Sequence, residues 1–259
     1  MTSNPDTQGD QGPQNPHQAF HICATPEDLP EELRAHVVSA GALSVLKSPL
    51  HTDIFPIALP MPIIDFIAFR KNQARQLLAK RLFEAFIFFH SRPFRMDILR
   101  DLVNDGIFDD TPEQYWPLAA RVWMDAEQPE DDQRWRLLLE AHLPHRDLMT
   151  PLENWDLLAK MPHEVTLYRG VHAKSPDEAQ SACLSGWSWS LCEDTAHWFA
   201  QRLCPATMRP YVASSTIPKT SIIAYLTARG EDEVIVCPQD AALQGIDIKL
   251  HHAAMALCG

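Results

Sequence analysis

The sequence predicts an α+β protein whose N-terminal part is helical and whose C-terminal part is built from short strands. Between Ile63 and His90, apolar side chains recur at helical spacing and form a wide stripe, with basic residues mostly off it. From Glu164 onward, short apolar runs are separated by glycine, proline and other turn residues, which is typical of strands. The pattern changes at Met161 and Pro162, so we expect a domain boundary near residue 160.

The N-terminal part divides into a tail and a helical region. Residues 1–20 are rich in Asn, Gln, Asp, Gly and Pro and lack hydrophobic periodicity, so we expect a disordered tail. Residues 21–160 are expected to form the helical region, whose last helix opens with a capping box, Thr150-Pro151-x-Glu153. Its helices are expected over residues 26–40, 63–90, 96–104, 112–127, 131–142 and 151–160.

The C-terminal part, residues 161–259, is expected to alternate strands with two helices. The first helix opens with a second capping box, Ser175-Pro176-Asp177-Glu178, and ends before Gly186, and the second covers residues 194–203. Strands are expected over residues 164–171, 186–190, 211–216, 221–228, 233–237 and 246–251.

The charge of the chain argues against nucleic acid as its main partner. The 259 residues include 22 Lys and Arg against 34 Asp and Glu, which gives a net charge of -12. Binding to phosphates requires a basic surface instead. Residues 1–160 contribute -9 of this charge and residues 161–259 contribute -3, so the acidity lies mostly in the helical region.

The cysteines and the apolar stretches favour a cytoplasmic protein without a membrane span. The six cysteines form no C-x-x-C pair and the chain shows no secretory segment, so we expect reduced thiols in a reducing cytosol. The most apolar stretch, residues 82–89, contains Glu84 and is far shorter than the roughly 20 residues that a membrane-spanning helix needs.

Arg169 stands at the end of an expected strand and is followed by Gly170. A glycine permits close approach of the backbone to a ligand, and the planar guanidinium presents a fork of donors that suits a phosphate group. The alternative, for this residue taken alone, is an arginine at a strand end that pairs with a surface carboxylate.

Serine and tryptophan alternate along the next expected strand, Gly186-Trp187-Ser188-Trp189-Ser190. Because successive side chains of a strand point to opposite faces, both serines share one face and both tryptophans share the other. We expect the tryptophans to be buried and the serines to face a cleft. The alternative is a half-exposed strand whose serines have no function.

Glu231 and Glu233 stand beside a tight turn, Arg229-Gly230, between two apolar strands. Alternation places both carboxylates on one face as the chain enters the second of these strands. Two carboxylates side by side repel each other, which is unfavourable unless the site has a use for both charges. The alternative is the solvated tip of a hairpin.

Taken in this order, the three motifs between Val165 and Pro238 resemble the mono-ADP-ribosyltransferase fold of the Arg–Ser–Glu class. That family carries an arginine on an early strand, a Ser-x-Ser strand and a Glu-x-Glu motif, to which Arg169, Ser188–Ser190 and Glu231–Glu233 correspond. Phe199 matches an aromatic residue that the family places on the next helix. The resemblance implies an ADP-ribosyltransferase-like split β-sandwich, and the helical part resembles, more loosely, segments in phage and bacterial proteins.

The resemblance also implies a reaction, the transfer of ADP-ribose from NAD⁺ to a protein with release of nicotinamide. NAD would be a substrate and no metal would be needed. Arg169 would hold the dinucleotide phosphate, Gly170 would offer its backbone to the nicotinamide amide, and Phe199 would contact the nicotinamide ring. Ser188 and Ser190 would line the NAD site. The histidines supply no evident metal-ligand set, and His251-His252 is expected to be a strand end.

The two glutamates receive different roles from the resemblance. Ser188 would position Glu233, and Glu233 would hold the ribose 2′-hydroxyl and stabilise the developing cation. Glu231 would orient or deprotonate the acceptor, as in the arginine-modifying members, so an arginine side chain is the favoured acceptor. The loop before Glu231 is short, however, and Trp189 replaces the usual threonine.

Two other function classes remain open at this point. An NAD glycohydrolase would use the same residues without a macromolecular acceptor. A non-enzymatic interaction protein would keep the fold while the helical region binds a partner. Free ADP-ribose without labelled protein would indicate the hydrolase, and absence of nicotinamide release would indicate the interaction protein.

Overall fold

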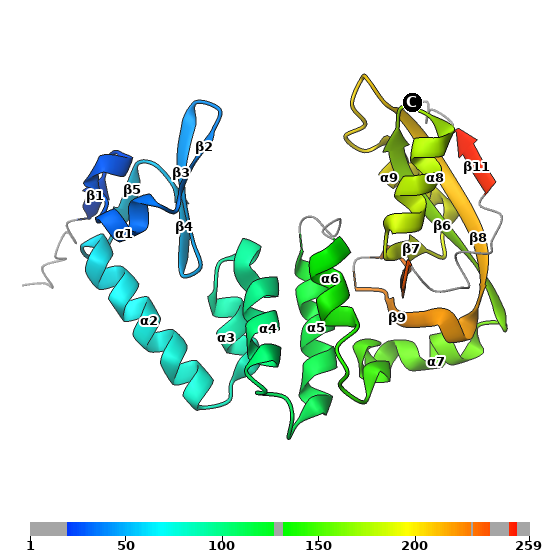
Figure 1. Ribbon diagram of the computed structural model, residues 1–259, viewed down its shortest axis with the longest axis horizontal. Coiled ribbons are helices and arrows are strands. Elements are labelled where there is room, and N and C mark those ends of the chain that lie inside the picture. The colour runs from blue at the N-terminus through cyan, green and yellow to red at the C-terminus, as the bar shows by residue number, and fades with distance from the viewer. Residues whose placement is uncertain (1–19, 127–131, 229, 239–248, 253–259) are drawn as a thin grey trace, which may run out of the picture. The chain divides into compact units, whose positions relative to one another are not determined.

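The computed structural model describes residues 20–126, 132–228, 230–238 and 249–252, which form helices and antiparallel sheets (Figure 1). This mixture confirms the α+β class. The chain forms two compact units, Met1–Ser91 and Arg92–Gly259. The tail expected over residues 1–20 lies, except for Phe20, outside the described residues.

The first unit combines two small antiparallel sheets with helices. In one sheet β1 (His21–Cys23) pairs with β5 (Ile57–Leu59), and the other contains β2 (Val37–Ala40), β3 (Leu43–Ser48) and β4 (His51–Ile54). The helices are α1 (Glu31–Arg34), α2 (Ile63–Ala79) and α3 (Phe83–Phe89), and Pro26–Asp28 forms a 3-10 turn. Its core consists of Cys23, Leu29, Leu33, Leu46, Ile57, Leu59, Ile63 and Ile67.

The prediction of a helical region is wrong for residues 21–59, which contain five strands. The helix expected over residues 26–40 is reduced to a 3-10 turn and α1, and β2 begins at Val37. Ala40 pairs with Leu43, so Gly41 and the residue after it form a two-residue hairpin loop, in which Gly41 has φ +64°. β-Branched residues before the loop and the positive φ at glycine favour this hairpin over a helix.

The helix expected over residues 63–90 is divided into α2 and α3. Arg81 has φ +54°, its N–H donates to the carbonyl of Leu78, and the N–H of Leu82 donates to the carbonyl of Leu77. This pair of bonds is a Schellman motif, which satisfies the last carbonyls of α2 and ends the helix. The sequence carries no glycine at this position, so the interruption was not predicted.

The second unit joins helices to one antiparallel sheet. The helices before the sheet are α4 (Arg95–Asn104), α5 (Tyr115–Asp125), α6 (Asp132–Leu139) and α7 (Leu152–Lys160), with 3-10 turns at Arg92–Phe94, Pro112–Gln114 and Arg146–Met149. The strands are β6 (Glu164–Ala173), β7 (Ser188–Ser190), β8 (Arg209–Pro218), β9 (Ile222–Leu226), β10 (Glu233–Val236) and β11 (Lys249–His252). Their order across the sheet is β11-β8-β6-β7-β10-β9, and α8 (Pro176–Ser185) and α9 (Glu193–Gln201) lie between strands in the chain.

The two helices within the sheet segment pack against β6 through different residues. Ala179 and Cys183 of α8 belong to the main core of this sheet, together with Leu167 of β6 and Trp189 of β7. Ala196 and Ala200 of α9 instead pack with Val212 of β8 and Tyr168 of β6. Since Leu167 and Tyr168 are consecutive in a strand, α8 and α9 cover opposite faces.

Gly170 allows α9 to approach β6 closely. A Cβ atom at Gly170 would lie 2.0 Å from the carbonyl oxygen of Ala196 and 2.5 Å from the amide nitrogen of Ala200. Both of these atoms belong to the helix backbone and have little freedom to move. A glycine at this position is therefore required by packing, whatever else it does.

Polar contacts tie the segment before the sheet to its edge strand, β9. The Thr150 hydroxyl accepts a hydrogen bond from the N–H of Tyr225 at 3.2 Å, and the buried Asn154 amide donates to the carbonyl of Tyr225 at 3.1 Å. Thr227 donates to Asn154 Oδ1 at 2.9 Å. Lys219 Nζ donates to the carbonyls of Ala159 and Met161. The helices from residue 95 onward therefore belong to the same compact unit as the sheet, whereas the sequence places a boundary near residue 160.

The two expected capping boxes have different outcomes. The hydroxyl of Ser175 accepts from the N–H of Glu178 at 3.2 Å, which confirms the cap of α8. The capping box at Thr150 is wrong, because the N-cap residue of α7 is Pro151 and the Thr150 hydroxyl is bound to β9.

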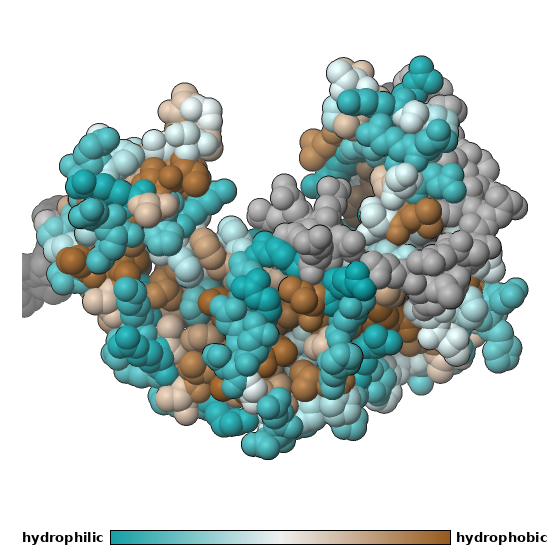
Figure 2. All heavy atoms as spheres, viewed as in Figure 1, coloured by the Kyte–Doolittle hydropathy of each residue, from teal (hydrophilic) through white to brown (hydrophobic). Residues whose placement is uncertain are grey.

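Among the described residues, no helix has the length and apolar character that would let it cross a bilayer. Figure 2 shows that the visible surface is largely hydrophilic, with apolar residues exposed in small groups.

The contact between Gly170 and α9 predicts a large loss of stability for Gly170→Ala. Displacing a helix backbone by an added methyl group should lower the free energy of unfolding by about 3 kcal/mol. Gly41→Ala is the matched control, since nothing lies within 4 Å of the added Cβ and only the positive φ opposes it. That control should cost about 1 kcal/mol. Chemical denaturation measures both values, and equal losses would contradict the packing role of Gly170.

Candidate active site

One pocket of about 810 Å³ in the second unit gathers the residues that the sequence singled out. Its walls come from β6, the segment around β7, α9, the loop that follows α9, and the turn before β10. All seven expected site residues line it: Arg169, Gly170, Ser188, Ser190, Phe199, Glu231 and Glu233. Residues that lie 64 positions apart in the chain thus converge on one cavity.

Glu233, the first residue of β10, is held by two donors on the same oxygen. Its side chain is buried, with 8% exposure. The Ser188 hydroxyl donates to Oε1 at 2.5 Å, and the indole N–H of Trp123 donates to Oε1 at 2.9 Å. No described residue donates to Oε2. A buried carboxylate requires such hydrogen bonds, and those to a charged acceptor are the stronger kind.

The sheet register brings Ser188 to Glu233. β7 and β10 are antiparallel, and Glu233 pairs with Ser190 while Ile235 pairs with Ser188. Ser188 and Glu233 therefore occupy diagonal positions on one face, within reach of each other's side chains. The expected burial of the tryptophans is confirmed, since Trp187 and Trp189 are each 2% exposed.

Trp123 was missed by the sequence analysis, which predicts only the helix that contains it, residues 112–127. It lies on α5, is 2% exposed and packs edge-on against Trp135 of α6, with ring centroids 4.6 Å apart. A buried indole usually finds a hydrogen-bond partner, which is the signal that could have drawn attention to it. The acceptor lies 110 residues away in the chain, so no local pattern identifies it.

The Glu-x-Glu turn is fixed by hydrogen bonds from neighbouring strands. The Ser190 hydroxyl donates to the carbonyl of Glu231 at 2.7 Å and accepts from the N–H of Cys192 at 3.0 Å. The N–H of Leu191 donates to the carbonyl of Asp232 at 3.0 Å. Ser190 thus holds the backbone of the turn, whereas the resemblance assigns it to the NAD site.

Asp232 supports the same turn with its side chain. It has φ +46°, a conformation that Asp adopts more readily than most residues. The Tyr225 hydroxyl donates to Asp232 Oδ1 at 2.7 Å. Burial, together with this hydrogen bond and the charge of Asp232, raises the pKa of Tyr225 to about 12. The turn that carries Glu231 and Glu233 is therefore anchored on both strands beside it.

Arg169 lies where β6 and β7 separate. These strands share a single pairing, Tyr168 with Ser190, and the Arg169 guanidinium donates through Nη1 to the carbonyl of Ser188. A Cβ at Gly186 would lie 2.0 Å from the guanidinium carbon, so the absence of a side chain there leaves room for Arg169. Burial raises the pKa of the nearby Cys183 thiol to about 11, and the positive charge of Arg169 opposes this rise.

The opposite wall of the pocket is formed by the end of α9 and the loop after it. Phe199 is 36% exposed, and its ring lies edge-on to that of Trp198 with centroids 4.9 Å apart. Arg202 stacks over Trp198, with its guanidinium carbon 4.8 Å from the ring centroid. Leu203 has φ +57° and is 85% exposed. The pocket is therefore lined by aromatic and basic groups on this side and by carboxylates at the turn.

Metal ligands do not gather within the described part of the chain. No group of three or more His, Cys, Asp or Glu residues there has the arrangement to hold a metal ion. The backbone of His251 and His252 forms the end of β11, as expected.

Comparison with protein-family models, with curated proteins and with solved structures finds no match to this chain. The chemistry of the pocket must therefore be argued from its own residues.

The anchoring of the turn predicts a pH-dependent effect of Tyr225→Phe. At pH 8 the variant should lose about 1–2 kcal/mol of unfolding free energy, because a hydrogen bond to a carboxylate is removed. The folded pKa of Tyr225, about 12, lies above the ordinary value of 10, so the protonated hydroxyl contributes fully below pH 10. That contribution is lost as the pH rises from about 10 to about 12.

Denaturant unfolding of wild type and variant between pH 8 and 12 measures this difference. The control is Tyr168→Phe, because no described residue is hydrogen-bonded to the Tyr168 hydroxyl. A difference between wild type and Tyr225→Phe that stays constant over this range would contradict the assignment.

Proposed function

We propose that this chain transfers ADP-ribose from NAD⁺ to a protein and releases nicotinamide, as an ADP-ribosyltransferase of the Arg–Ser–Glu class. The observation that carries the proposal is the 2.5 Å hydrogen bond between Ser188 and Glu233 inside a pocket that also contains Arg169. Residues of three motifs that are separate in sequence line this one pocket, and this convergence supports the proposal.

The sheet is compatible with the split β-sandwich of that class. β6 and β7 share one pairing, and the strand that carries Glu233 lies beyond β7. The separation of β6 from β7 opens the sheet where Arg169 and Gly170 line the pocket. A dinucleotide that lies across this opening would contact both halves of the sheet.

The chemical step breaks the bond between C1′ of the ribose and the nitrogen of nicotinamide. The electron pair leaves with nicotinamide, which departs as a neutral molecule, and positive charge develops on the ribose as an oxocarbenium-like ion. Glu233 carries the negative charge that stabilises this ion, and Ser188 keeps the carboxylate in place. A preorganised charge of this kind is a large part of catalysis in such reactions.

Charge and ring contacts in the rest of the pocket suit the remaining parts of NAD⁺. The guanidinium of Arg169 supplies donors for a phosphate, and Phe199 offers an aromatic ring for nicotinamide. Gly170 packs against α9 where a side chain would otherwise lie. Its backbone groups are what it can offer to the nicotinamide amide.

Glu231 is placed to act on the acceptor. Glu231 lines the same pocket as Glu233 and precedes it by two residues in the chain. Its backbone is fixed by the hydrogen bond from the Ser190 hydroxyl. A carboxylate at the pocket wall binds an incoming guanidinium and takes the proton that is released when the nitrogen attacks C1′. An arginine side chain is therefore the proposed acceptor.

Glu233→Gln tests the catalytic role of the carboxylate. The amide keeps the shape and still accepts hydrogen bonds, so NAD⁺ should bind with little change while nicotinamide release falls about 10²-fold or more. Glu164→Gln is the control, because Glu164 is an exposed residue of β6 outside the pocket. Release measured by chromatography and binding measured by calorimetry give the two readouts. Unchanged turnover in Glu233→Gln would refute this mechanism.

Glu231→Gln separates transfer to a protein from simple hydrolysis. Protein labelling from labelled NAD⁺ in a cell lysate should be abolished, because the acceptor proton has no base, while slow NAD⁺ hydrolysis should persist. Mass spectrometry of the labelled proteins identifies the acceptor residue. Wild-type release of ADP-ribose without any labelled protein would instead indicate an NAD glycohydrolase, and labelling that survives the substitution would remove Glu231 from acceptor chemistry.

A further inference from the structure

Helix α5 contributes a residue to the candidate active site that neither the motifs nor the resemblance includes. Trp123 donates its indole N–H to Glu233 Oε1 at 2.9 Å, in a buried setting. The Ser188 hydroxyl donates to the same oxygen at 2.5 Å. With both donors on Oε1 and none from the described residues on Oε2, the carboxylate has one rotational setting in which both contacts are satisfied.

We infer that Trp123 is a positioning residue for Glu233, which it holds so that Oε2 is the oxygen available to the ribose 2′-hydroxyl. This inference rests on the proposed function for the identity of the ligand. The contact itself is independent of that function. It also makes the helical segment before the sheet a part of the active site.

The surroundings of Trp123 hold its indole in a fixed place. The ring packs edge-on against Trp135 of α6. Within the same pair of helices, the Tyr115 hydroxyl at the start of α5 donates to the carbonyl of Leu138 in α6 at 2.7 Å. These buried contacts fix α5 against α6 at Trp123 and at the start of the helix.

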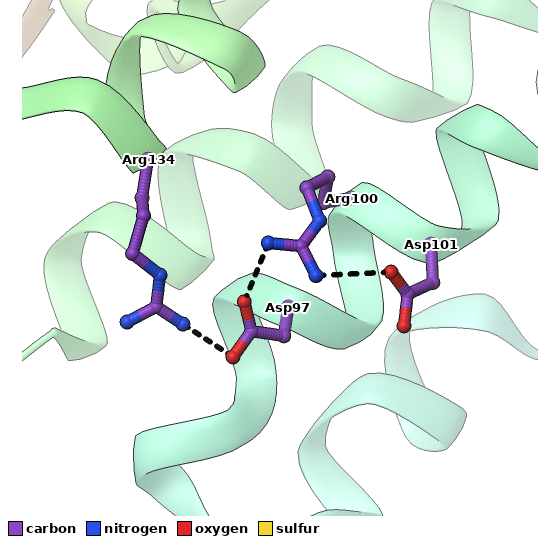
Figure 3. A network of polar contacts seen from close by, with 4 residues as sticks. All are labelled: Asp97, Arg100, Asp101 and Arg134. Atoms are coloured by element: carbon purple, nitrogen blue, oxygen red, sulfur yellow. Dashed lines mark hydrogen bonds and ion pairs between the residues drawn. The ribbon is translucent and has the colours of Figure 1, made fainter.

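Helix α4 links both of these helices through ion pairs. Arg95 of α4 is 2.6 Å from Asp125, which lies two residues after Trp123. Asp97 of α4 accepts from Arg134 of α6 and also pairs with Arg100 at 2.9 Å (Figure 3). Each partly exposed pair contributes little alone, but together they keep the two tryptophan-bearing helices in register.

Trp123→Phe removes the N–H donor and keeps an aromatic ring in the core. The matched control is Trp116→Phe, because Trp116 is a buried tryptophan of the same helix whose indole N–H donates to the carbonyl of Pro144 at 2.7 Å. Both variants lose one indole N–H donor and a similar volume from the core. A purely structural role of Trp123 would therefore give the two variants similar behaviour.

The kinetic test uses the full chain and measures nicotinamide release. We expect kcat of Trp123→Phe to fall about 10- to 100-fold, the size expected for one hydrogen bond to a charged group, with KM changed less than about threefold. Trp116→Phe should keep the wild-type kcat at an equal or greater loss of thermal stability. Equal kcat values for the two variants would overturn the inference.

A spectroscopic test does not depend on activity with NAD⁺. The indole N–H resonance of Trp123, identified by its loss in Trp123→Phe, should move to higher field in Glu233→Ala, while that of Trp116, which is bound to the carbonyl of Pro144, stays in place. An unmoved Trp123 resonance would overturn the inference even if the enzyme is active. Conversely, a wild-type chain that releases no nicotinamide would refute the proposed function, and the resonance would still report whether Trp123 holds Glu233.

Discussion

The hydrogen bonds on the buried carboxylate of Glu233 are the interactions on which the candidate site depends. A carboxylate with 8% exposure is stable in its charged form only if donors replace the water that it has lost. Ser188 and Trp123 are those donors, and they reach Glu233 from a neighbouring strand and from a helix. The sheet register and the docking of α5 must therefore both be correct before the carboxylate is in place. A chain that satisfies only one of them leaves a buried charge with half of its partners.

The same dependence explains why the helices from residue 95 onward form one unit with the sheet. As an edge strand, β9 has backbone groups on one side without a partner strand, and these could otherwise pair with another chain. The N–H and carbonyl of Tyr225 are instead bound by Thr150 and Asn154. Lys219 binds the carbonyls at the end of α7. The helical segment thus covers the sheet edge and supplies a donor to Glu233, and removing it would take away both.

Local patterns predicted the second unit better than the first. Alternation along the β7 segment identified the tryptophans as buried, because the direction of side chains in a strand follows from the backbone alone, although Ser190 is buried too. Sequence patterns failed for residues 21–59, where the strands are short and the helical spacing of a few apolar residues was misleading. They also failed at Arg81, since a Schellman motif without glycine leaves no mark in the sequence. At Thr150 the expected cap was lost because the hydroxyl found a partner on β9 instead.

The sequence by itself determined the α+β class, the burial of the two tryptophans beside the serines of β7, and seven of the residues that line the pocket. Each of these depends on backbone periodicity or on the order of motifs, which a linear chain already contains. Only the tertiary structure decided that Ser190 anchors the turn before β10, that Arg169 lies against Gly186, and that Trp123 donates to Glu233. The physical reason is that a donor is assigned its acceptor by how helices and strands dock, and the docking depends on packing across the whole unit.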